Sequence, residues 1–168
     1  MTPAALLIDA FGRIRHSVHD VVEGLAPEQL SFRLEGRANS IAWLVWHLTR
    51  IQDDHIADAA GADQVWTSGW SARFALPFDD SATGYGHSSD EVSAVRLQSG
   101  KLLTGYHEAV FQQTCRFVKP LTETNLARII DESWDPPVSL GVRLVSVVAD
   151  DLQHAGQAAL VRGIITHG

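Results

Sequence analysis

The segment Ile41–Leu48, IAWLVWHL, constrains the fold most strongly, because a helix through it is apolar on every side. A surface helix shows a single apolar stripe, whereas a helix that is apolar all round is covered by several neighbours. Asn39 or Ser40 can cap such a helix at its start, and Gly61 is a stop signal twenty positions on. The segment therefore predicts a helix over residues 41–60 in the interior of a helical bundle.

Both ends of the chain also show helical patterns. Thr2 and Pro3 form a start signal for apolar residues spaced by three or four positions, and this pattern ends near Gly24. The apolar segment 138–165 opens with β-branched residues that would suit a strand. Its length and its content of Ala, Leu and Gln favour one buried helix instead.

The middle of the chain predicts a third long helix between two connections. Ser88–Glu91 has the sequence of a capping box and predicts a helix that continues to about Val118. Residues 62–87 lack helical periodicity but hold many aromatic residues, which predicts a packed loop lying over the bundle. The connection that follows the third helix is expected to hold a helical turn around Leu126–Ile130. Four long helices predict an all-α fold, a four-helix bundle that forms a single domain over residues 1–168.

Charge and cysteine content narrow the function classes. Thirteen Lys and Arg against twenty Asp and Glu give a formal net charge of −7. A general nucleic-acid binder, which needs a dense basic surface, is therefore not expected. The single cysteine, Cys115, cannot form an internal disulfide or a thiolate metal cluster and fits a small apolar role. No apolar run approaches the ~18 residues of a membrane span, and the N-terminus lacks a secretory pattern, so we expect a cytoplasmic protein without a membrane partner.

A carboxylate and an imidazole share one face of the last predicted helix. At about 100° per residue, Asp150, His154 and Gln157 fall within roughly 60° of one another. Side chains at i and i+4 leave the same face one turn apart, so Asp150 and His154 can bind one cation together. His47 is the best candidate for a third ligand, because an imidazole inside an apolar helix most needs a partner. Two histidines and a carboxylate leave open coordination positions for water or substrate.

Other assignments of these histidines stay open. An Asp-x-x-x-His pair is common on helices, and His47 can equally be a hydrogen-bonded core histidine. His55 also points inward on the helical wheel and competes with His47 as the third ligand. Asp54, seven positions after His47, is a candidate for orienting the His47 imidazole.

Three polar residues of the last predicted helix have further candidate roles. Arg143 and Gln157 lie near the face of Asp150 and can touch a substrate. Asp151 fits a carboxylate that is either solvated or placed at a helix interface.

Three segments resemble those of a known group of proteins. They are NSIAWLVWHLTRIQDDHIADAAG at 39–61, WSARFALPFDDSATGYGHSSDEV at 70–92 and DPPVSLGVRLVSVVADDLQHAGQAALVRGII at 135–165. In this order they closely resemble an actinobacterial branch of the DinB/YfiT-like superfamily. The resemblance implies a four-helix bundle with long crossover connections, often assembled as a homodimer.

The same resemblance implies a metal site and a reaction class. The superfamily holds nickel or zinc with one histidine from its second helix and two histidines spaced i, i+4 on its fourth. Matched by position, these fall on His47, Asp150 and His154, so that a carboxylate replaces one imidazole here. Some members are transferases or isomerases that use the thiol cofactors mycothiol or bacillithiol.

The leading hypothesis is therefore a divalent-metal-dependent enzyme in which a thiol attacks a small electrophilic molecule. The alternatives are a non-catalytic, stress-associated bundle that binds a metal or ligand, and a metal-assisted hydrolase that needs no thiol.

Overall fold

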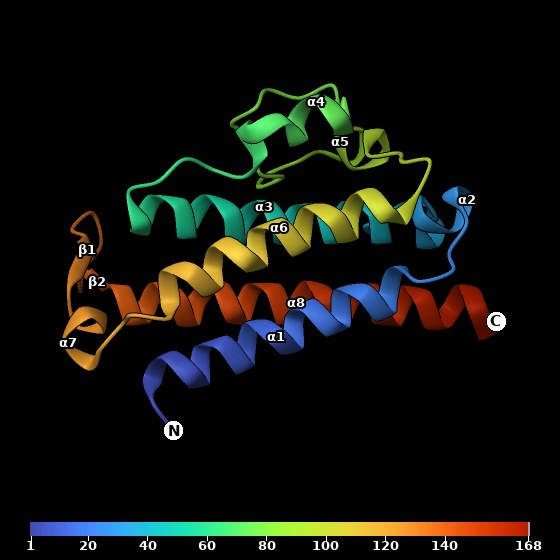
Figure 1. Cartoon of the computed structure of the whole chain (residues 1–168). Helices are drawn as coiled ribbons and strands as arrows, with labels where there is room; N and C mark the ends of the chain where they lie inside the picture. The colour runs from blue at the N-terminus through green and yellow to red at the C-terminus, as the bar shows by residue number, and fades with distance from the viewer. Residues whose placement is uncertain (168) are drawn as a thin grey trace.

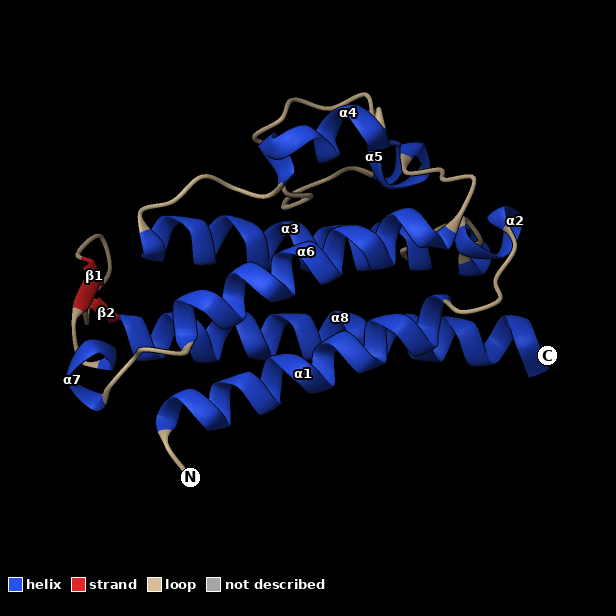
Figure 2. Cartoon of the chain, in the orientation of Figure 1, coloured by secondary structure: helices blue, strands red, loops and turns tan. Residues whose placement is uncertain are grey.

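Four long helices form a bundle in this computed structural model, which describes residues 1–167 (Figure 1). They are α1 (Pro3–Val22), α3 (Ile41–Ala60), α6 (Gly100–Val118) and α8 (Leu140–His167). The helix α8 packs against α1 and α3, and α6 packs against the same two helices from the other side of the core. Figure 2 shows that helix dominates the chain, and the predicted all-α bundle is confirmed.

The long helices α1 and α3 begin and end where the sequence predicts, because their caps are local. The Thr2 hydroxyl accepts a hydrogen bond from the backbone N–H of Ala5 at 3.1 Å. At α3 the cap is Ser40 rather than Asn39, and its hydroxyl accepts from the N–H of Trp43 at 3.2 Å. Gly61 ends α3 with a φ of 62°, the left-handed conformation that glycine adopts without steric penalty.

The predicted helix from Ser88 to Val118 is wrong, because the chain leaves the helical path between Val95 and Ser99. The capping box at Ser88 opens only the short α5 (Ser89–Ala94), and a second cap at Ser99 starts α6. The interruption turns the side chains of Val95 and Leu97 into the core, where both are buried. It also brings the first residue of α6, Gly100, so close to α1 that a Cβ there would overlap the Val22 side chain.

The connection before α8 also differs from its prediction. A helical turn, α7 (Glu123–Leu126), comes slightly earlier than expected, and β1 (Ile129–Asp131) follows it. This strand pairs antiparallel with β2 (Val138–Ser139), so the β-branched start of the last segment forms a strand. The helix α8 begins only at Leu140, where the backbone N–H donates to the carbonyl of Arg128 at 2.8 Å.

Residues 62–99, here called the lid, cover α3 and α6 (Figure 1, top). The lid holds a π-helical turn at Trp66–Trp70, the short α4 (Ser71–Phe74) and α5. Its aromatic side chains pack on the bundle: the ring of Trp66 lies 5.2 Å from that of Tyr106 on α6. The Asp53 carboxylate of α3 accepts hydrogen bonds from the backbone N–H of Val65 at 2.9 Å and of Trp66 at 2.8 Å. The predicted packed loop is therefore present.

Two short elements, α2 (Pro27–Leu30) and the 3-10 turn at Leu34–Gly36, connect α1 to α3. Over residues 1–167, no helix combines the length and the hydrophobicity that crossing a bilayer requires.

Candidate metal centre

The packing of α3 against α8 brings together the three residues that the sequence singles out. His47, Asp150 and His154 each offer one ligand atom, and these atoms all lie within 4.8 Å of one another. The two helices run antiparallel, because His47 lies beside His154 while His55, two turns further along α3, lies beside Arg143. His47 is buried, and Asp150 and His154 are half-buried at the edge of the helix pair.

The geometry of the three side chains suits a cation. The imidazole rings of His47 and His154 lie 4.8 Å apart and nearly perpendicular, and His154 Nε2 lies 3.6 Å from Asp150 Oδ1. The other oxygen of Asp150, Oδ2, is buried and has no hydrogen-bond partner. Buried carboxylate oxygens are normally paired, so an unpaired oxygen beside two imidazoles fits a bound metal ion.

The tautomer of His47 is set by the lid. Its Nδ1 lies 2.6 Å from the carbonyl oxygen of Thr83, which can only accept, so Nδ1 carries the proton. The remaining nitrogen, Nε2, then has a free lone pair for a metal. Burial lowers the pKa of His47, mainly through desolvation, and this keeps the imidazole neutral as metal ligation requires.

Asp54 does not orient His47, contrary to the prediction. Its carboxylate accepts a hydrogen bond from Gln64 Nε2 at 2.8 Å instead. Seven residues along a helix span about 10 Å, so a side chain on the same line of α3 is too far away to reach His47. The Thr83 carbonyl takes the role assigned to Asp54, and no local spacing in the sequence indicated it.

Gln157 contacts a histidine of the cluster. His154 Nδ1 lies 3.2 Å from the Gln157 amide oxygen, so the ring donates there and directs Nε2 toward Asp150. Gln157 also lines a small apolar cavity of about 190 Å³ beside Leu44 and Leu160. None of the three cluster residues lines this cavity, and Gln157 is the residue that connects it to His154.

His55 and Arg143 lie apart from the three residues. Arg143 Nη1 lies 3.2 Å from His55 Nδ1, and Arg143 Nη2 donates to the Asp131 carboxylate of β1 at 2.7 Å. Burial and the Arg143 charge together lower the pKa of His55. The guanidinium is thus already paired, and His55 acts as its acceptor rather than as a third ligand.

An aromatic wall that includes a histidine of the lid borders the cluster. The indole of Trp43 stacks on His47 with ring centroids 4.6 Å apart and meets His154 edge-on at 6.3 Å. Trp43 Nε1 donates to His87 Nδ1 at 3.2 Å, and the His87 ring stacks on Trp46. Sequence reasoning missed His87, because it lies forty residues from His47 and only the folding of the lid brings it near.

Asp151 and Cys115 take no part in the cluster. Asp151 is fully buried with both carboxylate oxygens unpaired, and this burial raises its pKa well above the usual range. It is therefore buried at the helix interface rather than solvated, and its burial favours the protonated form of the carboxyl. Cys115 is half-buried, and burial raises the pKa of its thiol, which disfavours a nucleophilic thiolate.

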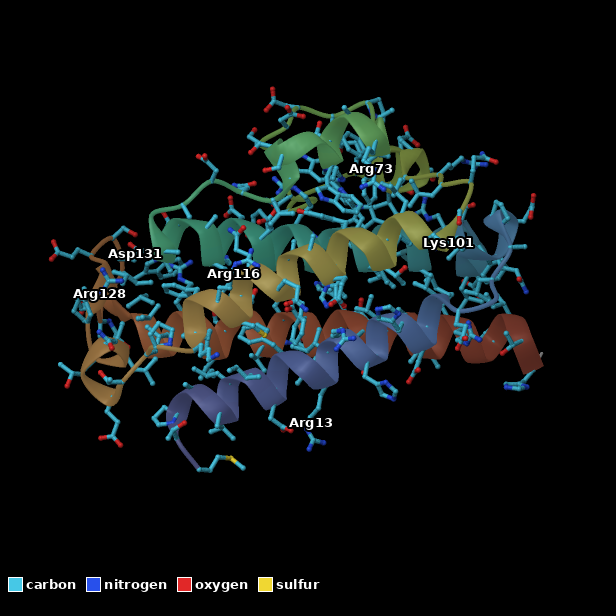
Figure 3. The ribbon with its side chains drawn as sticks, viewed as in Figure 1. Arg13, Arg73, Lys101, Arg116, Arg128 and Asp131 are labelled. Carbon is cyan, nitrogen blue, oxygen red and sulfur yellow. The ribbon has the colours of Figure 1, made fainter. Side chains whose placement is uncertain are left out.

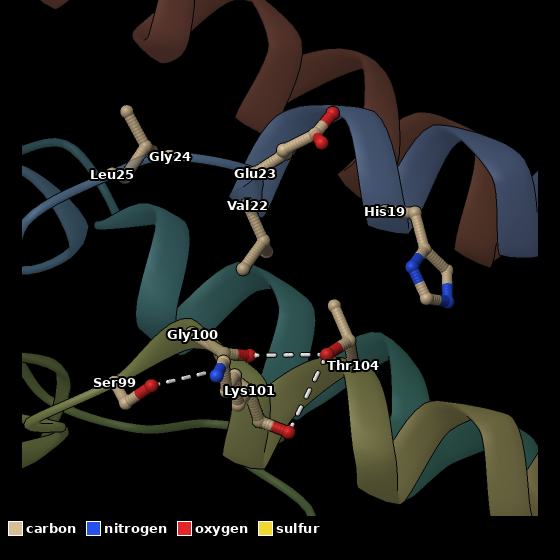
Figure 4. Close-up of a pocket in the computed structure, with 9 residues that line it drawn as sticks. All are labelled: His19, Val22, Glu23, Gly24, Leu25, Ser99, Gly100, Lys101 and Thr104. Carbon is tan, nitrogen blue, oxygen red and sulfur yellow. Dashed lines mark hydrogen bonds between the residues drawn. The ribbon is translucent and has the colours of Figure 1, made fainter.

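A larger cavity lies elsewhere. It has a volume of about 520 Å³ and is located between the end of α1 and the start of α6, where Glu23, Lys101 and Thr104 line it (Figure 4). None of the three cluster residues borders this cavity. Chemistry at the cluster would therefore take place outside this cavity.

Basic side chains are distributed over several elements. The labelled ones in Figure 3 come from α1 (Arg13), α4 (Arg73), both ends of α6 (Lys101 and Arg116) and the residue before β1 (Arg128). The expectation that the protein has no nucleic-acid partner stays a prediction.

Two comparisons with known proteins agree with this fold. The chain is similar over its full length to a solved structure described as a conserved protein from Enterococcus faecalis, with 27% sequence identity and a TM-score of 0.92. The alignment covers 100% of this chain and 99% of that one. No curated protein matches the sequence. A family model described as mycothiol-S-transferase matches residues 6–167, and the chain therefore belongs to the mycothiol-S-transferase family, of the DinB/YfiT-like type.

Proposed function

We propose that the protein is a divalent-metal-dependent enzyme that joins a low-molecular-weight thiol, of the mycothiol or bacillithiol kind, to a small electrophilic molecule. The observation that carries this proposal is the set of His47, Asp150 and His154, assembled from two helices with a buried, unpaired oxygen on Asp150. The family match supports the thiol and the transfer reaction.

His47, Asp150 and His154 would hold the ion, and nickel or zinc is the expected metal. Bound there, the ion supplies Lewis acidity, which lowers the pKa of a thiol or water and so provides a nucleophile at neutral pH. The Thr83 carbonyl and the Gln157 amide oxygen accept from the Nδ1 atoms of the two imidazoles and so leave both Nε2 atoms free for the ion. The indole of Trp43 covers one side of His47 and excludes water from it.

The electrophile would bind beside the cluster, on the side of Gln157. The apolar cavity at Gln157 and Leu44 lies next to His154 and has room for a small uncharged group. Cys115 is not the nucleophile, because its thiol is held in the protonated form. The nucleophile must therefore be an added small molecule.

Elemental analysis and a thiol-dependence assay test the proposal. Protein purified without a histidine tag should carry about one divalent ion per chain, and His47→Ala should lose it. The metal-loaded protein should consume an electrophile such as a bimane reagent faster with mycothiol than without it. Activity that persists without thiol would favour the hydrolase alternative. Substoichiometric metal that His47→Ala leaves unchanged would favour the non-catalytic bundle.

A further inference from the structure

A short part of the lid, residues 79–87, crosses α3 directly over His47, and we call it the strap. The Thr83 carbonyl accepts the His47 Nδ1–H at 2.6 Å. The next residue, Gly84, is buried and lies so close that a Cβ would be 2.7 Å from His47 Nδ1 and 3.0 Å from the Trp46 ring. The backbone of the strap is therefore in direct contact with the imidazole.

Only glycine fits at position 84. Its φ of +96° lies in the left-handed region, which side chains rarely adopt, and the space for a side chain is already filled by His47, Trp46 and Trp43. Gly86 also has a positive φ, of +75°, but a Cβ there would meet nothing within 4 Å. Replacing either glycine with alanine would therefore strain the backbone at a positive φ. Of the two, only Gly84 contacts the candidate metal ligand.

Arg50 fixes the strap from below. Its guanidinium is fully buried and donates to the carbonyl oxygens of Asp80 and Ala82, each at 3.1 Å, and to Gln64 Oε1 at 2.7 Å. A buried charge persists only when it is hydrogen-bonded and paired, and Asp53 lies 3.8 Å away as its counter-charge. Since Ala82 immediately precedes Thr83, this anchor also sets the position of the Thr83 carbonyl.

Arg50 and His47 lie on the same face of α3, less than one turn apart in the sequence. The helix α3 therefore carries both His47, the candidate metal ligand, and Arg50, which holds in place the strap that accepts the His47 hydrogen bond. A rigid unit of α3 and the strap results, in which the His47 ring is restrained by Thr83 on its edge, Trp43 on its face and Gly84 above Nδ1.

We infer that the strap is a positioning element of the metal centre: Thr83, Gly84 and Arg50 hold the tautomer and direction of His47, so that seating of the strap and metal binding stabilise each other. This inference rests on the proposed metal centre. Coupling between two equilibria is reciprocal, so a strap that raises metal affinity must itself be held more firmly once the metal is bound. If the strap only supplied a hydrogen-bond acceptor to a buried histidine, metal binding would not make the strap more firmly held.

Calorimetric titration with Zn²⁺ or Co²⁺ tests the inference with two matched variants. Gly84→Ala should bind the metal about 10–100-fold more weakly, the range found when a partner of a ligating histidine is lost. Gly86→Ala should bind within about threefold of wild type. Metal affinities of Gly84→Ala and Gly86→Ala that are equal would overturn the inference.

Amide hydrogen exchange in the wild-type protein gives a second readout that does not depend on any variant folding. Adding Zn²⁺ should slow exchange in residues 79–87 and leave the amides of α1 unchanged. If the protein binds Zn²⁺ but the exchange rates in the strap do not change, this inference is overturned and the proposed metal centre is not. Failure of the wild type to bind any divalent metal would instead overturn the proposed metal centre, and this inference with it.

Discussion

At the scale of single residues, the cluster differs from the family pattern at one position. Asp150 supplies an anionic oxygen where a histidine is expected from the superfamily. A carboxylate is a harder ligand than imidazole and lowers the net charge of the bound ion, so it should weaken the ion's Lewis acidity. Its oxygen Oδ2 is buried and has no hydrogen-bond partner.

Substitution of Asp150 should change the metal preference. We expect Asp150→His to preserve binding and to shift preference toward nickel and zinc over manganese and magnesium, because imidazole is the softer ligand. Asp150→Ala should lower the affinity for every divalent metal by more than about tenfold, because losing a direct ligand costs more affinity than losing a residue that supports a ligand. Competitive titration of the three proteins measures both effects. Wild-type affinity and preference in a folded Asp150→Ala would contradict the ligand set.

A second residue-scale prediction concerns His107, which is fully buried on α6. Desolvation lowers its pKa to about 3, so the folded protein holds it neutral while the unfolded chain protonates it near pH 6.5. The unfolded state therefore binds the extra proton between these values, and His107 contributes stability that is lost as the pH falls from about 6.5 toward 3.

Replacing His107 should flatten this acid dependence. Between pH 7 and pH 5 the free energy of unfolding of the wild type should fall by about 2 kcal/mol more than that of His107→Gln. Urea unfolding at both pH values, with a chelator present, measures the difference. His16→Gln, an exposed substitution on α1, is the control and should follow the wild type. Parallel acid profiles for the wild type and His107→Gln would disprove the assignment.

At the scale of elements, close helix contacts decide where the helices begin. The break between α5 and α6 is not a failure of helix propensity, because Ser88–Ala94 and Ser99–Val118 each carry their own cap. The break exists because Val95 and Leu97 gain burial and because α6 must start against the end of α1. Packing therefore outweighs the hydrogen bonds that one continuous helix would have kept.

Two glycine substitutions distinguish the effect of helix packing on stability from the effect of helix propensity. Gly100→Ala should destabilise the fold by about 1–3 kcal/mol, since its Cβ would overlap Val22. Gly12→Ala, in the interior of α1 with nothing within 4 Å of its Cβ, should stabilise by about 0.5–1 kcal/mol. Chemical denaturation compares the two. If both variants were stabilised alike, the close contact between α1 and α6 would be wrong.

At the scale of the whole molecule, α8 leaves an uncharged row on its outer face. The row is exposed and spaced alternately by three and four positions; it consists of Val142, Val145, Ala149, Leu152, Gly156 and Ala159. This heptad spacing is that of helices that pair with their own kind, and the small members allow two helices to approach closely. Each copy carries a net charge of −7, so copies repel one another, and pairing along this uncharged row would bring no like charges of the row into contact.

We therefore expect the homodimer implied by the superfamily to form along α8. Light scattering coupled to size-exclusion chromatography should give twice the mass of the chain. The Leu152→Asp variant should give the mass of a single chain. Leu6→Asp, at an exposed apolar position on α1, should leave the mass unchanged. A dimer that resists Leu152→Asp would place the interface elsewhere.

Local sequence determined a large part of this molecule by itself. The helices α1 and α3 follow from apolar periodicity and from caps at Thr2 and Ser40, whose hydrogen bonds reach only three residues along the chain. The shared face of Asp150 and His154 follows from the i, i+4 spacing of any helix. These features need no partner from elsewhere in the chain, which is why the pattern alone predicts them.

Only the tertiary structure decided which residues meet. The antiparallel packing of α3 on α8 places His47, rather than His55, beside Asp150 and His154. The fold of the lid, and not the spacing of Asp54, supplies the acceptor for His47 at Thr83. Each of these contacts joins residues more than thirty positions apart, and its geometry depends on the relative placement of whole elements, which no local periodicity specifies.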